Sequence, residues 1–208
     1  MIAIVDYGMG NVRSLKNAFE YFGHDIIVTK DHEEIKAADR IVLPGVGAFG
    51  DAMDAIRKNG LQDILTDQAL EVKKPILGIC LGMQLFARKS HEHGEYQGLG
   101  WIDADVKRIE VDAPLKVPHV GWNNIDFPQD DWLFDGIRSD QANFYFVHSY
   151  HMVCRNSEEL LATTDYGFPV TAVVRSENLL AIQFHPEKSQ DNGLQILENW
   201  VNWEPTRC

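Results

Sequence analysis

Short apolar runs alternate with segments of helical periodicity along the N-terminal half of the chain. Residues 2–5 read Ile-Ala-Ile-Val, a pattern typical of a strand that is buried on both faces. Residues 11–22 then place one apolar face at helical spacing before Gly23 ends the segment. That face consists of Val12, Leu15, Ala18, Phe19 and Phe22. The pattern predicts a strand followed by an amphipathic helix.

The same alternation continues to the middle of the chain. Further strands are expected at 26–28, 41–43 and 76–79, and helices at 49–59 and 61–72. Strands that alternate with helices in this way form parallel sheets with helices on both faces. We therefore predict an α/β fold.

The C-terminal half has a different pattern, with more prolines and glycines between apolar runs. We expect strands at 99–111, 144–147, 160–164, 170–174 and 179–184, which would add an antiparallel part to the sheet. A last helix is expected at 193–203. No linker, repeat or low-complexity tract divides the chain, so residues 1–208 are expected to form one domain.

Composition narrows the functional classes. The 208 residues carry 19 basic and 31 acidic side chains, and the net charge of −12 argues against general nucleic-acid binding. Cys80, Cys154 and Cys208 do not make a disulfide framework, and we expect Cys154 to be a buried apolar side chain and Cys208 a terminal thiol. A chain that starts with a strand and has no long apolar run is expected to be cytoplasmic, without a signal peptide or membrane span.

Cys80 lies where a predicted strand turns into a helix. It is flanked by Gly78 and Gly82, the cysteine version of the nucleophile elbow. The glycines permit a sharp turn, the helix N-terminus favours the thiolate, and the Leu81 N–H is placed to donate to an oxyanion. From the turn alone, a buried structural cysteine in a βα unit is an equal alternative.

A second segment favours the catalytic interpretation. Residues 181–188 read as a strand with a polar end, and alternate residues of a strand point the same way. His185 and Glu187 are therefore expected to face one site, with Pro186 stiffening the link. A thiol needs a base and the base needs an orienting acceptor, so Cys80, His185 and Glu187 form a candidate triad. Alone, His185 would more simply be a surface histidine at a strand end.

Six stretches together resemble a known family. They are Asp-Tyr-Gly-Met-Gly-Asn at 6–11, Leu-Pro-Gly-Val-Gly-Ala-Phe at 43–49, the Cys80 elbow, Val-Pro-His-Val-Gly-Trp-Asn at 117–123, Phe-Val-His-Ser-Tyr at 146–150 and Gln-Phe-His-Pro-Glu-Lys-Ser at 183–189. Across essentially its whole length the chain resembles the class I (triad) glutamine amidotransferases, and within them the glutaminase subunits of imidazole glycerol phosphate synthase. The resemblance implies a flavodoxin-like three-layer fold, with a mostly parallel central sheet and an added antiparallel part.

The resemblance also implies a set of site residues. Gly45 and Val46 would join Leu81 in an oxyanion hole, although the segment 44–47 alone reads as a plain glycine turn. In members of the family, this segment often has to reorient before it forms a working oxyanion hole. The implied glutamine site comprises Gly47, Gln84, His148, Ser149 and Tyr150. Without the resemblance, Gln84 would be a solvated helix residue.

A partner is implied as well, because free ammonia would be protonated and lost in water. In the family the partner is a (β/α)8-barrel cyclase subunit (HisF-like), which uses the ammonia to make imidazole glycerol phosphate. Asn11, Trp122 and Lys188 are placed by resemblance at the interface of this heterodimer, and the Lys188 side chain is expected to point away from His185. The chemistry requires no metal or organic cofactor.

Two other functions stay open from the sequence. Residues 98–104 depart from the usual pattern of the histidine-pathway subunit and look more like a paralogue that supplies ammonia to a sugar amidotransferase in surface-polysaccharide biosynthesis. A non-catalytic or peptidase-like relative of the same fold is the alternative from another class. The complete candidate triad argues against a pure binder, and the glutamine-site stretches argue against a peptidase.

Overall fold

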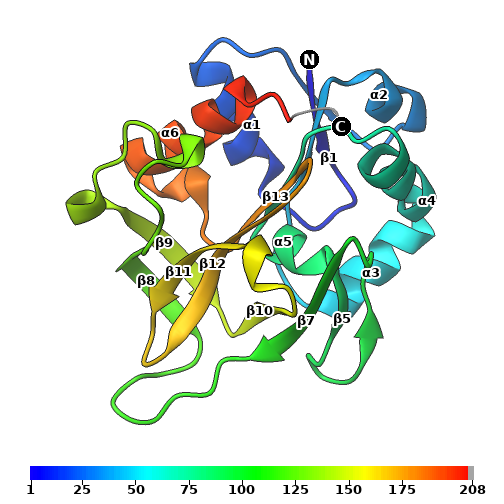
Figure 1. Cartoon of the computed structure of the whole chain (residues 1–208). Coiled ribbons are helices and arrows are strands. Elements are labelled where there is room, and N and C mark those ends of the chain that lie inside the picture. Colours follow the sequence, from blue (N-terminus) through cyan, green and yellow to red (C-terminus); the bar gives the residue numbers. More distant parts are fainter. Residues whose placement is uncertain (206–208) are drawn as a thin grey trace.

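A seven-stranded sheet forms the centre of the computed structural model, which describes residues 1–205 (Figure 1). Its order is β11-β12-β13-β4-β3-β1-β2. The five strands from β13 to β2 are parallel, and β12 and β11 continue the sheet antiparallel. In chain order the strands are β1 (Ile2–Val5), β2 (Ile26–Thr29), β3 (Arg40–Leu43), β4 (Ile76–Ile79), β11 (Leu160–Asp165), β12 (Pro169–Ser176) and β13 (Leu179–Ile182). The predicted α/β class with an antiparallel extension is confirmed. Cys208 lies outside the described residues.

Helices cover both faces of this sheet. The apolar sides of α1 (Val12–Tyr21) and α6 (Gln190–Asn202) pack in one cluster with Leu77 and Ile79 of β4. On the other face, α2 (His32–Ala37), α3 (Phe49–Lys58), α4 (Leu61–Thr66) and α5 (Leu81–Leu85) pack with Ile41 and Leu43 of β3. Residues two apart in a strand thus face the same helical layer, and the residues between them face the other layer. No helix within residues 1–205 is long and apolar enough to cross a membrane.

Two smaller sheets extend the core beside the antiparallel strands (Figure 1). One has four strands in the order β10-β7-β5-β6, and the other is the β8–β9 ribbon. Their bounds are β5 (Ala87–Ser90), β6 (Tyr96–Gln97), β7 (Ile102–Arg108), β8 (His119–Asn124), β9 (Asn143–His148) and β10 (Tyr150–Cys154). Short 3-10 turns complete the fold at Trp132–Phe134, Ser139–Gln141, Ser157–Glu159 and Pro186–Lys188.

Several predicted boundaries differ from the structure. The helix expected at 61–72 ends at Thr66 and continues as a π turn, Asp67–Glu71. The strand expected at 99–111 spans Ile102–Arg108, and the strand expected at 179–184 ends at Ile182. The sequence did not predict α2, β5, β6 or β10, because these elements have six residues or fewer and most of them lack a clear apolar periodicity.

The turn between β4 and α5 is crowded, which explains its glycines. Cys80 has φ 55° and ψ −110°, outside the ordinary regions for an L-residue. A Cβ on Gly82 would lie 1.8 Å from the Leu43 carbonyl oxygen, and one on Gly78 would lie 2.9 Å from the Gly82 carbonyl oxygen. The helix therefore starts against the backbone of β3, and this close approach presents Cys80 at the sheet edge.

We predict that Gly82→Ala lowers the free energy of unfolding by about 3 kcal/mol or more, because backbone atoms would have to shift to admit the methyl group. Urea unfolding measures the loss. Gly23→Ala is the control, because no atom lies within 4 Å of the added methyl group there, and its positive φ of 79° alone is expected to cost about 1 kcal/mol. Equal losses in the two variants would contradict the crowded-turn explanation.

Three buried histidines lie in the β8–β9 ribbon and in β10, the strand that follows it in the chain. His119 is on β8, His148 on β9 and His151 on β10. Burial lowers the pKa of His119 to about 4, of His148 to about 3 and of His151 to about 4. All three imidazoles are therefore neutral in the folded protein at neutral pH.

This arrangement predicts a loss of stability in mild acid. Below the ordinary histidine pKa of about 6.5, these three histidines bind protons in the unfolded chain but stay neutral in the folded chain. The free energy of unfolding therefore decreases as the pH drops from about 6.5 towards 4. Each histidine contributes a slope of about 1.4 kcal/mol per pH unit in that window. In His151→Gln, urea unfolding between pH 6.0 and 5.0 should show the slope reduced by about this amount. The exposed His93→Gln serves as the control and should leave the slope unchanged.

Candidate active site

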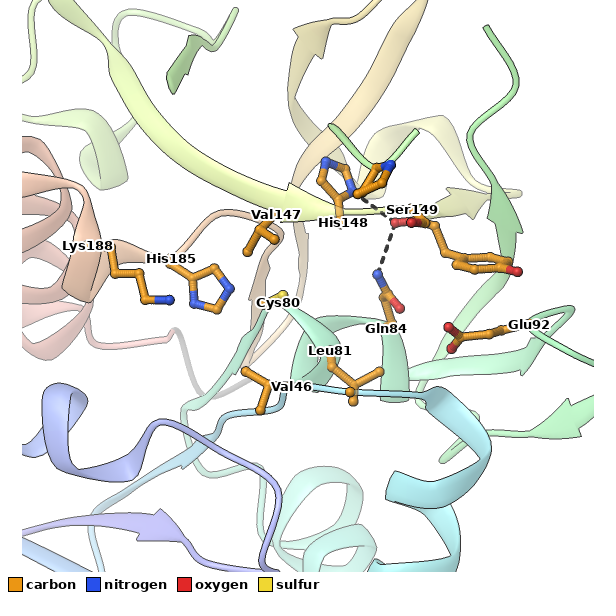
Figure 2. Close-up of a pocket in the computed structure, with 13 residues that line it drawn as sticks. Val46, Cys80, Leu81, Gln84, Glu92, Val147, His148, Ser149, His185 and Lys188 are labelled. Carbon is orange, nitrogen blue, oxygen red and sulfur yellow. Dashed lines mark hydrogen bonds between the residues drawn. The ribbon is translucent and has the colours of Figure 1, made fainter. Parts of the chain in front are cut away.

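A cavity of about 390 Å³ opens at the carboxyl ends of β3, β4 and β13 (Figure 2). Ligands commonly bind at this edge in open α/β sheets, because loops from adjacent parallel strands meet there. The lining residues are Val46, Gly47, Cys80, Leu81, Gln84, Glu92, Pro118, Val147, His148, Ser149, Tyr150, His185 and Lys188. The elbow thus places Cys80 in the wall of this cavity.

The three candidate triad residues come together at this cavity. The His185 ring faces Cys80 in Figure 2, and its Nε2 atom has no hydrogen-bond partner among residues 1–205. On the other side, Nδ1 lies 2.9 Å from Glu187 Oε1, and both side chains are almost completely buried. Burial lowers the pKa of His185, but interaction with Cys80 and Glu187 outweighs burial and raises it to about 10. The arrangement suits an imidazolium held between a thiolate and a carboxylate.

The backbone that brings His185 and Glu187 together is not the one predicted from strand alternation. Strand β13 ends at Ile182, and Pro186–Lys188 forms a 3-10 turn that carries Glu187 back towards the imidazole. The His185 N–H donates to the Tyr145 carbonyl at 2.9 Å, which ties this segment to β9. Pro186 starts the turn because its fixed φ fits a first helical position.

One peptide unit blocks the predicted oxyanion hole. The Gly45 carbonyl accepts a hydrogen bond from the Leu81 N–H at 3.3 Å, and the Val46 N–H of the same unit donates to the Met9 carbonyl, also at 3.3 Å. The preceding Pro44 carbonyl accepts from the Tyr7 hydroxyl at 2.8 Å. Neither predicted donor, Leu81 or Val46, is therefore available to an oxyanion in this conformation.

The predicted glutamine-site residues all line the cavity, and their hydrogen bonds fix their orientation. Gln84 Nε2 donates to the Tyr150 carbonyl and to Gln183 Oε1, each at 3.0 Å (Figure 2). Gln183 in turn places its Nε2 3.8 Å from Cys80 Sγ. Both amide hydrogens of Gln84 are used within the protein, so its oxygen is the group left for a ligand.

Sequence reasoning missed two polar residues of the site, one behind the cavity wall and one in it. Gln183 is completely buried at the end of an apolar strand, and a buried glutamine at such a position was the available signal. Glu92 also lines the cavity (Figure 2), and its Oε2 accepts from the Phe49 N–H at 2.7 Å, at the start of α3. Nothing local marks Glu92, since its partner is 43 residues away in the chain.

The predicted interface residues surround the mouth of the site. Asn11 Nδ2 lies 3.5 Å from Glu187 Oε1, so Asn11 contacts the buried carboxylate. Trp122 is 46% exposed and packs edge-on against Tyr145. Lys188 Nζ lies 5.8 Å from the centre of the Tyr145 ring and lines the cavity. The expectation that Lys188 points away from His185 was wrong, because the 3-10 turn brings its head towards the mouth beside that imidazole (Figure 2).

Comparison with known proteins agrees with this geometry. The family "Glutamine amidotransferase class-I" matches residues 3–203. The chain is 48% identical to imidazole glycerol phosphate synthase subunit HisH 2 of Nitrobacter winogradskyi, covering 98% of this chain and 99% of that protein. It is 46% identical to subunit HisH of Sulfurimonas denitrificans, covering 98% of each. A crystal structure of a glutamine amidotransferase shares the fold with a TM-score of 0.70 at 22% identity, over 96% of this chain and 98% of that one. The chain belongs to the class I glutamine amidotransferases.

Proposed function

We propose that this chain is the glutaminase subunit of an imidazole glycerol phosphate synthase. It hydrolyses glutamine to glutamate and ammonia and passes the ammonia to a (β/α)8-barrel cyclase partner in histidine biosynthesis. The observation that carries the proposal is the set of Cys80, His185 and Glu187 at one cavity, with His185 hydrogen-bonded to Glu187 and facing the sulfur. The names of the close relatives support the pathway.

The reaction follows from the positions of these side chains. The Cys80 thiolate attacks the amide carbon of glutamine, and the carbonyl π electrons move to oxygen to give a tetrahedral oxyanion. The His185 cation donates its Nε2 proton to the departing nitrogen, the C–N bond breaks, and ammonia leaves a glutamyl thioester. Neutral His185 then takes a proton from water, which attacks the thioester and releases glutamate. Glu187 holds the imidazole and stabilises its cation throughout.

Glutamine recognition would use the fixed polar groups of the cavity wall. The Gln84 oxygen accepts from an N–H of the substrate, because both hydrogens of this side chain are already donated. The Glu92 carboxylate, which lines the same cavity, suits the α-ammonium group. Gly47, Ser149 and Tyr150 supply backbone groups around the substrate.

The oxyanion segment is in a resting conformation in this proposal. Rotation of the Gly45–Val46 peptide would remove the Gly45 carbonyl from the Leu81 N–H and turn the Val46 N–H into the same space. Both donors would then face the developing oxyanion, and Gly45 would serve as the pivot. Glutamine would be hydrolysed only when the rotated state is populated.

The partner surface is proposed around the cavity mouth. Val120 and Trp122 on β8 and Val147 on β9 are exposed apolar side chains, with exposed fractions of 54%, 46% and 37%. Val46 of the oxyanion segment and Lys188 lie at the mouth of the same cavity. An exposed apolar patch beside the Lys188 ammonium fits a partner that presents apolar side chains and an acidic group. Such a partner would enclose the site and receive the ammonia.

The other two functions have less support. The close relatives do not favour a paralogue acting in polysaccharide biosynthesis, and the cavity wall with a candidate triad does not favour a binder or a peptidase. We infer a cytoplasmic location, because Cys80 and Cys154 are free thiols and Cys80 must stay reduced to act.

We predict that Cys80→Ala abolishes glutamine hydrolysis but retains synthesis by the complex when ammonia is supplied directly. The sulfur provides the covalent route, whereas the ammonia acceptor lies in the partner. In the unmodified chain, an electrophilic glutamine analogue should label Cys80 and not Cys154, since burial raises the pKa of the Cys154 thiol to about 12. Peptide mapping distinguishes the two. Substantial glutamine turnover by Cys80→Ala would exclude the proposed nucleophile.

We also predict that the isolated chain turns over glutamine slowly and that the barrel partner with its nucleotide ligand accelerates it on the order of 10²–10³-fold. That is the range measured when a single oxyanion donor is removed from another enzyme. Glutamate release with and without partner gives the ratio, and a matched assay without the nucleotide separates docking from activation. Equal rates in isolation and in the complex would mean that the resting peptide does not limit turnover.

A further inference from the structure

A chain of hydrogen bonds runs from the β8–β9 ribbon to the glutamine pocket. Asn123 Nδ2 lies 3.3 Å from His119 Nε2, and His119 Nδ1 lies 3.0 Å from His148 Nε2. His148 Nδ1 then lies 2.9 Å from the Tyr150 carbonyl oxygen, which also accepts from Gln84. His119 and His148 are direct cross-strand partners in the ribbon register. Neither Asn123 nor His119 lines the cavity.

The proton positions in this chain have one consistent assignment. A carbonyl can only accept, so His148 must carry its proton on Nδ1 and accept at Nε2. His119 must therefore donate from Nδ1, which leaves its Nε2 to accept from the Asn123 amide. The second amide hydrogen of Asn123 goes to the Asp165 carbonyl at 2.9 Å, and its oxygen accepts from the Asn124 N–H, also at 2.9 Å. Every group is satisfied only when both imidazoles are neutral.

The chain ends on the atom that orients Gln84. The Tyr150 carbonyl receives two hydrogen bonds, one from His148 and one from Gln84, so both of its lone pairs are occupied. A carbonyl held in this way fixes the Gln84 amide with its oxygen on the cavity side. Consecutive hydrogen bonds that point in one direction also polarise and strengthen one another.

We infer that His119 is a positioning residue for glutamine binding: its Nδ1–H donates to His148 Nε2 and holds that imidazole against the Tyr150 carbonyl, which orients Gln84. The inference rests on the proposed glutaminase function. His119 stacks on Phe146 and Tyr166, with ring centres 4.9 Å and 4.0 Å away, and this packing holds its Nδ1 towards His148. A purely apolar residue would fill the space but would leave the buried His148 Nε2 without its donor.

Two variants distinguish the effect of the hydrogen bond that His119 donates from the effect of its packing. In His119→Asn the amide nitrogen occupies the position of Nδ1 and retains a donor to His148, whereas His119→Leu has nearly the same shape and no donor. Both lose the stacked ring and the acceptor for Asn123. In the complex with the barrel partner, His119→Leu should raise KM for glutamine about tenfold with kcat within about twofold of the unmodified protein. His119→Asn should stay within about threefold in KM.

Glutamine titration by calorimetry, in chains that also carry Cys80→Ala, measures binding without turnover. If the Cys80→Ala chain with native His119 binds no glutamine, the proposed function fails. If it binds, and His119→Leu and His119→Asn bind equally well, the positioning role fails and the proposed function stands. A tenfold gap between the two variants supports the role.

Nitrogen-15 NMR of the imidazoles tests the same inference in the unmodified full chain and needs no substitution to fold. At pH 7, His119 and His148 should both be neutral with the proton on Nδ1. A proton on Nε2 of His148, or a charged imidazole at either position, would overturn the assignment. In His119→Leu, the Nε2 signal of His148 should move towards that of an imidazole nitrogen that accepts no hydrogen bond, while His119→Asn should keep the signal of the unmodified protein.

Discussion

The strained backbone at Cys80 is the constraint on which the rest of the site depends. A non-glycine residue at φ 55° and ψ −110° costs on the order of 1–3 kcal/mol and persists only where its surroundings determine it. Here the Cys80 N–H donates to the Ile182 carbonyl at 2.8 Å, and α5 is pressed against β3 through Gly82. The sulfur is thereby held at the junction of three parallel strands. His185 follows β13 and the segment 44–47 follows β3, the two strands that flank β4 in the sheet.

The same crowding accounts for the control of the oxyanion segment. Because the start of α5 touches β3, the Leu81 N–H lies within reach of the Gly45 carbonyl. A helix N-terminus has unsatisfied N–H groups, and a nearby carbonyl is a natural partner for one of them. The Leu81 N–H, the donor in the proposed mechanism, is therefore satisfied inside the protein until something displaces the peptide. Because Val46 also lies at the cavity mouth, a docked partner would touch the segment that must move.

Sequence patterns predicted the parts of this structure that local chemistry determines. The glycines around Cys80 predicted the elbow because no other residue fits the observed contacts, and the apolar runs predicted most of the central sheet. His185 and Glu187 were placed together correctly but for the wrong reason, since a 3-10 turn and not a strand unites them. Glu92 and His119 act through partners at least 29 residues away in the chain, and no local periodicity encodes such contacts.

Two groups of histidines with opposite proton requirements lie in and behind the wall of this cavity. His185 is stabilised as a cation because a buried carboxylate and the thiolate lie on either side of it. His119 and His148 have backbone and amide partners and no carboxylate in their chain, so burial dominates and keeps them neutral. The positive charge of His185 is a minor cause of the lowered pKa of His148, after burial and the neighbouring His119 and His151. The charged group that drives the chemistry therefore helps to keep the binding wall in the neutral form that its hydrogen bonds require.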